Sequence, residues 1–250
     1  MKRLIFITAA FLSQAAFAEG SFTVKTGVDY TTGTYGTDTT TEITAIPLIG
    51  TYETGNWTFK ASIPYVRITG SDNVVAGVGA VRRTTTTVRT DSGLGDLVTS
   101  ATYSFMIDPK SQFGIDVTGK VKWGTADSDR GLGTGENDFW VLIDPYTRIG
   151  NVTWFGGIGF GMLGSSATLP LKDVYSANAG LSFKLDQQSS AGAMLDYRSR
   201  STDTGFAQRE LTGFYTRTLG GGYKLQAYAT KGFADGSPDW GGGLNIAYSY

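Results

Sequence analysis

Apolar and polar residues alternate with a period of two over much of this chain, in segments of about ten residues separated by turn residues. In one such segment the apolar positions are Trp57, Phe59, Ala61 and Ile63, and the positions between them are Thr58, Lys60 and Ser62. Successive side chains of a β-strand point to opposite faces, so the pattern predicts strands with one apolar and one polar face. The sequence has no sustained helical stripe, and no run of about 18 apolar residues that could form a membrane-spanning helix.

The connections between these segments alternate in length. Strands are expected at residues 22–33, 39–53, 57–69, 93–107, 112–126, 136–149, 152–164, 172–185, 190–200, 207–219, 223–235 and 239–250. The connections near residues 55, 110, 150, 187 and 221 are short, whereas 70–92 and 127–135 are long. Short turns on one side and long loops on the other are typical of a bacterial outer-membrane barrel. We therefore predict an all-β fold, a transmembrane antiparallel up-and-down β-barrel of about twelve strands, as a single domain over residues 19–250.

A soluble β-sandwich would also alternate, but the aromatic residues favour the barrel. Those next to short connections are Phe22, Trp57, Phe105, Phe113, Trp154, Phe183, Tyr223 and Tyr250, and those next to long loops are Tyr30, Tyr65, Trp123, Phe139, Tyr175, Tyr197 and Trp240. Aromatic rings favour the headgroup level of a bilayer, so a membrane barrel carries two such belts. A sandwich has no physical reason to produce them.

The first residues predict export. Lys2 and Arg3 precede an apolar run that reaches Phe17, and the run ends in Ala16-Phe17-Ala18. A charged start, a short apolar stretch and an A-x-A site define a secretory signal peptide, so residues 1–18 are expected to be cleaved. Together with the barrel, this predicts an integral protein of the bacterial outer membrane.

The amino-acid composition limits the catalytic and metal-binding chemistry that the chain can perform. The chain has 40% hydrophobic and 17% charged residues, no histidine and no cysteine. Catalytic triads, histidine-ligated metals, thiolate chemistry and disulfides are therefore excluded, and we expect no catalytic residue, metal or cofactor. A formal net charge of -1 gives no reason to expect nucleic acid as a partner. Gly159 to Gly164 satisfies G-x-G-x-x-G, but it lies inside an expected strand with no helix to receive a phosphate.

If the apolar face meets lipid, the polar face lines a lumen. By parity that face carries the acidic residues Asp29, Asp96, Asp116, Asp138, Asp144, Asp196 and Glu210, and the basic residues Lys25, Lys60, Lys120, Lys122, Arg148, Lys184, Arg198 and Lys224. The candidate lumen-lining set is Lys60, Asp96, Asp116, Lys120, Lys122, Asp144, Arg148, Asp196 and Arg198. Such charges either pair across strands and fill a narrow lumen or stay hydrated in a pore, and twelve strands lie between filled and open barrels.

The longest connection, 70–92, carries Arg82, Arg83 and Arg89 around Thr84 to Thr87. It is expected to project from the rim, to fold over the barrel mouth, or to be a solvated loop without a partner. At the other end of the chain, Leu244, Ile246, Tyr248 and Tyr250 resemble the C-terminal signal that the barrel assembly machinery reads.

Two short motifs carry a family resemblance. Ile63-Pro64-Tyr65-Val66 ends one strand and Gly93-Leu94-Gly95-Asp96-Leu97 opens the next, with a long loop between them. This arrangement resembles the outer-membrane channel family named for the meta-cleavage pathway of phenol degradation. The resemblance implies uptake of small, often aromatic or hydrophobic molecules, and it makes Asp96 an acid at the pore mouth.

The sequence therefore leaves two functions open. The first is a passive channel for small solutes, with outer-membrane lipid, the assembly machinery and a small-molecule solute as partners. The second is a non-conducting barrel that acts through its external loops in structure, adhesion or partner binding.

Overall fold

The computed structural model describes residues 20–80, 87–167 and 169–250. The expected signal peptide, and Arg82, Arg83 and Thr84 to Thr86 of the long loop, lie outside the described residues. Within the described part of the chain, no helix is long and apolar enough to cross a membrane.

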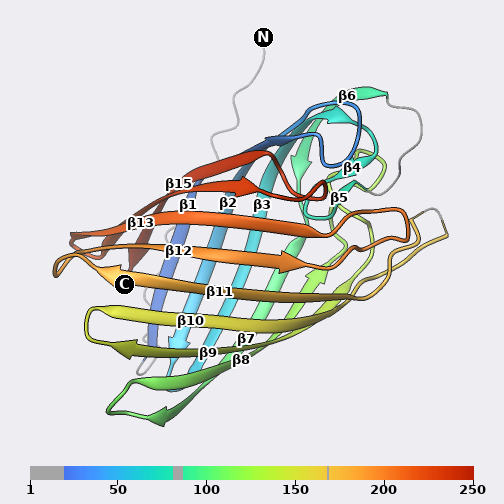
Figure 1. The fold of residues 1–250 in the computed structure, drawn as a ribbon. Helices are drawn as coiled ribbons and strands as arrows, with labels where there is room; N and C mark the ends of the chain where they lie inside the picture. Colours follow the sequence, from blue (N-terminus) through green and yellow to red (C-terminus); the bar gives the residue numbers. More distant parts are fainter. Residues whose placement is uncertain (1–19, 81–86, 168) are drawn as a thin grey trace.

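The described residues form a closed antiparallel β-barrel (Figure 1). The strands are β1 (Gly20–Gly33), β2 (Thr41–Thr54), β3 (Trp57–Ser71), β4 (Val74–Val75), β5 (Gly79–Ala80), β6 (Val88–Leu94), β7 (Leu97–Asp108), β8 (Phe113–Trp123), β9 (Asp138–Ile149), β10 (Val152–Met162), β11 (Val174–Lys184), β12 (Ser189–Arg198), β13 (Gln208–Gly220), β14 (Tyr223–Gly232) and β15 (Trp240–Ser249). Neighbours in sequence pair around the wall, and β1 closes it against β15. This confirms the predicted fold.

One predicted strand is different. The segment expected at 93–107 is two strands, because β6 pairs with the loop-side end of β3 and β7 pairs with its other end. The break falls at Gly95 and Asp96, where a Cβ on Gly95 would lie 2.8 Å from Pro64 Cγ. Glycine there allows the two backbones to approach closely. The two pieces share one wall position, so the wall still has twelve positions.

The short connections are tight turns, and most of them contain a left-handed residue. Gly55 has φ of 55° and Gly150 has φ of 63°, values that glycine adopts without a Cβ clash. The first described residue, Gly20, the C-terminal Tyr250 and the short turns lie at one end of the barrel, which is the periplasmic end of an outer-membrane barrel. The long loops, with the β4–β5 hairpin, lie at the opposite, extracellular end (Figure 1).

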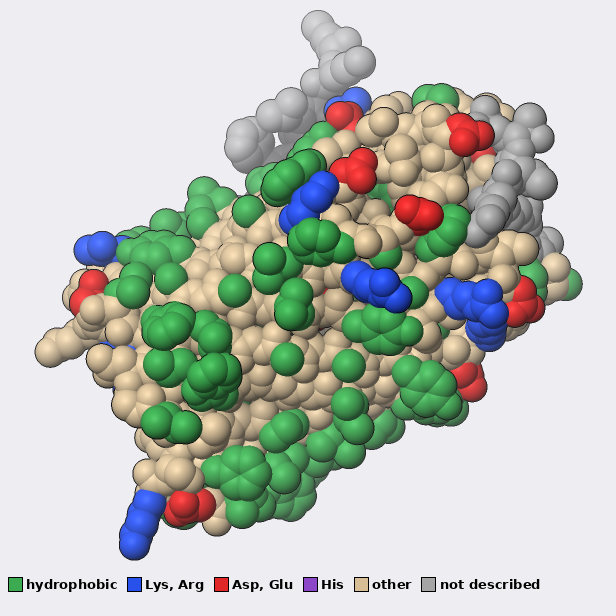
Figure 2. Space-filling model, viewed as in Figure 1, with side chains coloured by type: hydrophobic (Ala, Val, Ile, Leu, Met, Phe, Trp, Pro, Cys, Tyr) green, Lys and Arg blue, Asp and Glu red, His purple; other side chains and the backbone are tan. Residues whose placement is uncertain are grey.

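The outer face is apolar and carries the two aromatic belts. Exposed rings near the short turns include Phe22, Trp57, Phe105, Trp154, Phe183, Tyr223 and Tyr250, and those near the long loops include Tyr30, Tyr65, Trp123, Phe139, Tyr175, Tyr197 and Trp240. Figure 2 shows hydrophobic side chains spread over the wall, with charged side chains mainly towards its two ends. An exposed apolar band between aromatic belts is the surface that a bilayer solvates.

Candidate functional site in the barrel lumen

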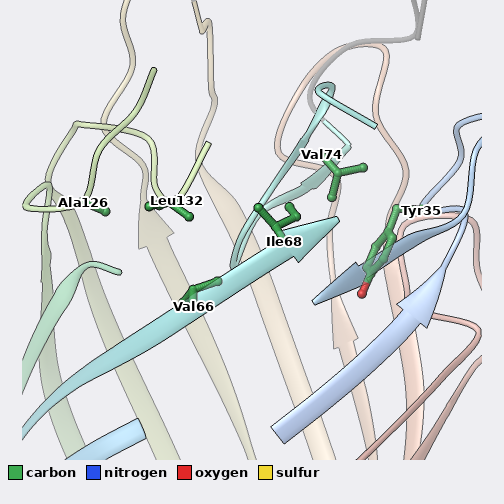
Figure 3. Close-up of a cluster of buried hydrophobic side chains, with 6 residues drawn as sticks. All are labelled: Tyr35, Val66, Ile68, Val74, Ala126 and Leu132. Atoms are coloured by element: carbon green, nitrogen blue, oxygen red, sulfur yellow. The ribbon is translucent and has the colours of Figure 1, made fainter. Parts of the chain in front are cut away.

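The lumen is the candidate site, and its packing changes along the barrel axis. The buried hydrophobic residues gather at the extracellular mouth, where Tyr35, Val66, Ile68, Val74, Ala126 and Leu132 form a cluster (Figure 3). Further down, the polar side chains of Asp116, Lys120, Asp144 and Asp196 keep part of their surface accessible. The barrel is therefore packed at its mouth and looser below it.

The mouth is filled by the loop that follows β3. Residues 74–80 form the small β4–β5 hairpin, which is not part of the wall. Val74 is 0% exposed and packs with Ile68 on the inner face of β3. Of the three expectations for this loop, its described residues 74–80 show the one in which it folds over the mouth.

The hairpin is held from the far wall. The Arg198 guanidinium, on β12, donates hydrogen bonds to the carbonyl oxygens of Gly77 at 3.1 Å and Val78 at 2.6 Å. In the order of the wall, β12 lies six positions from β3, which is diametrically opposite in a barrel of twelve positions. The described part of the connection that follows β3 therefore reaches the opposite side of the opening at Gly77 and Val78.

A second group of contacts fastens the neighbouring loops. Lys122 Nζ lies 3.2 Å from a carboxylate oxygen of Asp96 and 3.2 Å from one of Asp138. Asp96 also accepts the backbone N–H of Ala126, and Asp138 accepts that of Gly164. The three charged side chains are largely buried, so this is a desolvated ion cluster that ties two loops to the wall.

Below the mouth, the strand register places like charges opposite one another. Asp116 on β8 faces Asp144 on β9, and Asp196 on β12 faces Glu210 on β13. Asn178 lies between the two pairs, opposite Asp196, with its amide nitrogen 3.5 Å from Asp144 Oδ1. We call these five residues the acidic row.

Lysines occupy a different part of the lumen. Lys60 on β3 and Lys120 on β8 both lie opposite Ser100 of β7, one on each side of it. The Lys120 ammonium lies 4.5 Å from the centre of the Trp140 ring. Lys25 on β1 donates a hydrogen bond to Gln226 at 3.2 Å. We call Lys25, Lys60 and Lys120 the basic row.

The two rows are separated rather than paired. Among the described residues, the candidate lumen residues that form ion pairs are Asp96 and Lys122. Like charges placed directly opposite destabilise a sheet unless water or ions screen them. The geometry therefore favours a hydrated lumen over one filled by cross-strand ion pairs. The separation of the acidic row from the basic row also produces an electric field across this lumen.

Arg148 lies apart from both rows. Its Nε donates to the carbonyl oxygen of Gly150 at 3.1 Å, so its guanidinium lies towards a periplasmic turn.

The hydrophobic cluster in the mouth is not predicted by the alternation of apolar and polar residues. Its available signal was Val66 and Ile68, two apolar residues on the face of β3 that carries Lys60 and Ser62 further down.

Comparisons with known proteins give matches of structure only. No family model matches the chain, and no curated protein does. An outer membrane channel from Pseudomonas putida F1 matches with a TM-score of 0.73 and 13% identity, covering 94% of this chain and 97% of that chain. The KdgM porin in complex with disordered oligogalacturonate matches with a TM-score of 0.53 and 8% identity, covering 92% and 99%. At these identities the likeness is one of fold, and it agrees with the predicted outer-membrane barrel.

Proposed function

We propose that this chain is a passive channel for small solutes in the bacterial outer membrane. The observation that carries the proposal is the state of the charges below the mouth. The acidic and basic rows are partly accessible and unpaired, whereas a purely structural lumen would pair or bury them. The fold, shared with the channel from Pseudomonas putida F1, supports the same function.

The charge distribution narrows the solute class. The acidic row spans β8 to β13, so a polyanion would meet an unfavourable wall over half of the barrel. Small neutral or cationic solutes fit this lumen better than an acidic oligosaccharide. The family resemblance of the Ile63 to Leu97 region adds small aromatic or hydrophobic molecules to that class.

We assign no catalytic role to any residue of this chain. The sequence contains neither histidine nor cysteine. The charged residues of the mouth are engaged in holding loops: Arg198 holds the hairpin, and Lys122 holds Asp96 and Asp138.

Planar-bilayer recording of the refolded chain tests the proposal. We expect discrete conductance steps in potassium chloride, and a reversal potential under a salt gradient that reports cation preference. Changing Asp116→Asn together with Asp144→Asn should move that potential towards anions, because it removes two fixed negative charges from the acidic row. The matched control is Asp203→Asn, on an extracellular loop where the carboxylate is 89% exposed and pairs with Lys172. Equal reversal potentials in all three proteins would reject a pore through the acidic row.

The packed mouth supports a second candidate, the non-conducting barrel that binds partners through its external loops. Under that function, neither the wild-type chain nor a chain with the hairpin released should conduct. Deleting residues 74–88 should instead abolish surface or partner binding in cells. Conductance in the released chain would reject this second candidate.

A further inference from the structure

The lipid-facing wall carries two adjacent cations at its extracellular end. Arg209 is the second residue of β13 and its side chain is exposed on the outer face. Lys231 on β14 lies opposite Leu211, so it is the diagonal neighbour of Arg209 across the two strands. Diagonal neighbours have Cα atoms about 7–8 Å apart, within reach of long side chains. Neither cation forms an ion pair with a carboxylate of the described residues.

Aromatic rings of the extracellular belt surround this pair. The Lys231 ammonium lies 4.5 Å from the centre of the Trp240 ring. Tyr197 lies opposite Arg209 on one side, and the backbone of Phe233 bonds to Arg209 on the other. All three rings are exposed on the outer face. Because such rings lie at the headgroup level, the two cations lie where lipid phosphates are found.

An apolar groove begins directly below the cations. It has a volume of about 340 Å³ and runs across the outer face of β10 to β13. Leu211, which faces Lys231 across the strand pair, lines its upper end together with Leu195. Its floor is formed by small residues, including Ala179 and Ala193, and Trp154 of the periplasmic belt lies at its lower end.

Another exposed cation on the outer face near this rim has a different setting. Arg67 on β3 lies in a polar recess with Glu42, Thr44, Thr69 and Thr90. A carboxylate shares that recess, and the lining is hydroxylic rather than apolar. Arg67 is therefore a natural control for surface charge alone.

We propose that Arg209 and Lys231 bind a phosphate group of an outer-leaflet glycolipid of the lipid A class, with one acyl chain lying in the groove below. Two unpaired like charges at adjacent positions destabilise the wall unless an anion lies between them, and a phosphate accepts hydrogen bonds from both. The groove independently supplies the apolar contact for the chain attached to that headgroup. The two cations lie above the groove, as the phosphate of such a lipid lies above its acyl chains.

The test uses the chain refolded in detergent, so that no lipid is carried over from cells. Bisphosphorylated lipid A is titrated in, and bound lipid is counted by native mass spectrometry while folding is followed by heat-modifiable gel migration. We expect binding to the wild-type chain and a loss of about tenfold in affinity for each of Arg209→Gln and Lys231→Gln, as expected for one charge-assisted contact. Ala193→Phe, which fills the groove, should weaken binding while both cations remain. Arg67→Gln should leave binding unchanged.

Three outcomes would overturn the proposal. The first is equal affinity in the wild-type chain and the Arg209→Gln, Lys231→Gln double variant. The second is an equal loss in Arg67→Gln, which would reduce the effect to surface charge. The third is full competition by inorganic phosphate at the lipid's own concentration, which would identify a phosphate site without a lipid. Each variant lies on the outer surface, and gel migration shows whether it is folded.

Discussion

Removing the Arg198 side chain should open the mouth. In the closed arrangement its guanidinium donates two hydrogen bonds to the β4–β5 hairpin, at 3.1 Å and 2.6 Å. Hydrogen bonds that involve a charged group contribute about 1.5–3 kcal/mol each, but the freed carbonyls regain water once the hairpin moves. We therefore expect Arg198→Ala to weaken docking by about 2–3 kcal/mol. This corresponds to a shift of about 30-fold to 150-fold in the ratio of open to closed mouths.

Single-channel recording in planar bilayers measures that ratio directly. Arg198→Ala should show a larger mean conductance and a larger open fraction than the wild-type chain. Arg198→Lys keeps the charge but cannot donate two parallel N–H groups in the guanidinium geometry, so it should fall between the two. Wild-type open fraction and conductance in a folded Arg198→Ala barrel would refute the role of the tether.

Three further predictions concern the ion cluster around Lys122, the buried Tyr35 and the C-terminal Tyr250. Lys122→Met should lower the free energy of unfolding by about 3 kcal/mol, because it leaves two buried carboxylates unpaired; urea unfolding against the exposed control Lys224→Met checks this, and equal midpoints would contradict it. Burial raises the pKa of Tyr35 to about 12, with the Glu210 and Asp239 carboxylates adding to the effect. The neutral phenol is thus favoured in the folded state, and stability should fall between about pH 10 and pH 12; Tyr35→Phe should remove that part of the loss, and superimposable pH profiles would count against it. Removing Tyr250 should reduce surface levels in cells but not refolding in detergent, as immunoblots of outer-membrane fractions would show; unchanged surface levels would remove it from the assembly signal.

The wall could be predicted because membrane strands have a period. Lipid requires apolar residues at alternate positions, and Trp57, Phe59, Ala61 and Ile63 satisfy that requirement. Tight turns at Gly55 and Gly150 then delimit the strands. Parity likewise assigns Asp116, Lys120 and Asp144 to the inner face, because the side-chain period of a strand is two.

The mouth could not be predicted in the same way. The hydrogen bonds from Arg198 to the hairpin join residues about 120 positions apart in the sequence. No repeating pattern of apolar and polar residues indicates such a contact. The break at Gly95 depends on the approach of Pro64 from another strand. The separation of the acidic and basic rows depends on register, since a residue's face is set by parity but its neighbour is set by how the strands align.

The inner face of β3 is polar in its periplasmic half and apolar at the mouth. Lys60 and Ser62 face the looser region, whereas Val66 and Ile68 face the hydrophobic cluster under the hairpin. Passage should therefore be limited at the mouth, where apolar packing excludes water, while ion preference arises below it, where the charges are accessible. The two properties should be separable: Arg198→Lys, which keeps the charge but weakens the tether, should change open fraction with little change in reversal potential, and the Asp116→Asn, Asp144→Asn pair should do the reverse. Combining the three substitutions should give additive effects, because the groups share no contact among the described residues. Strong non-additivity in either property would place the gate and the selectivity region at the same level of the barrel.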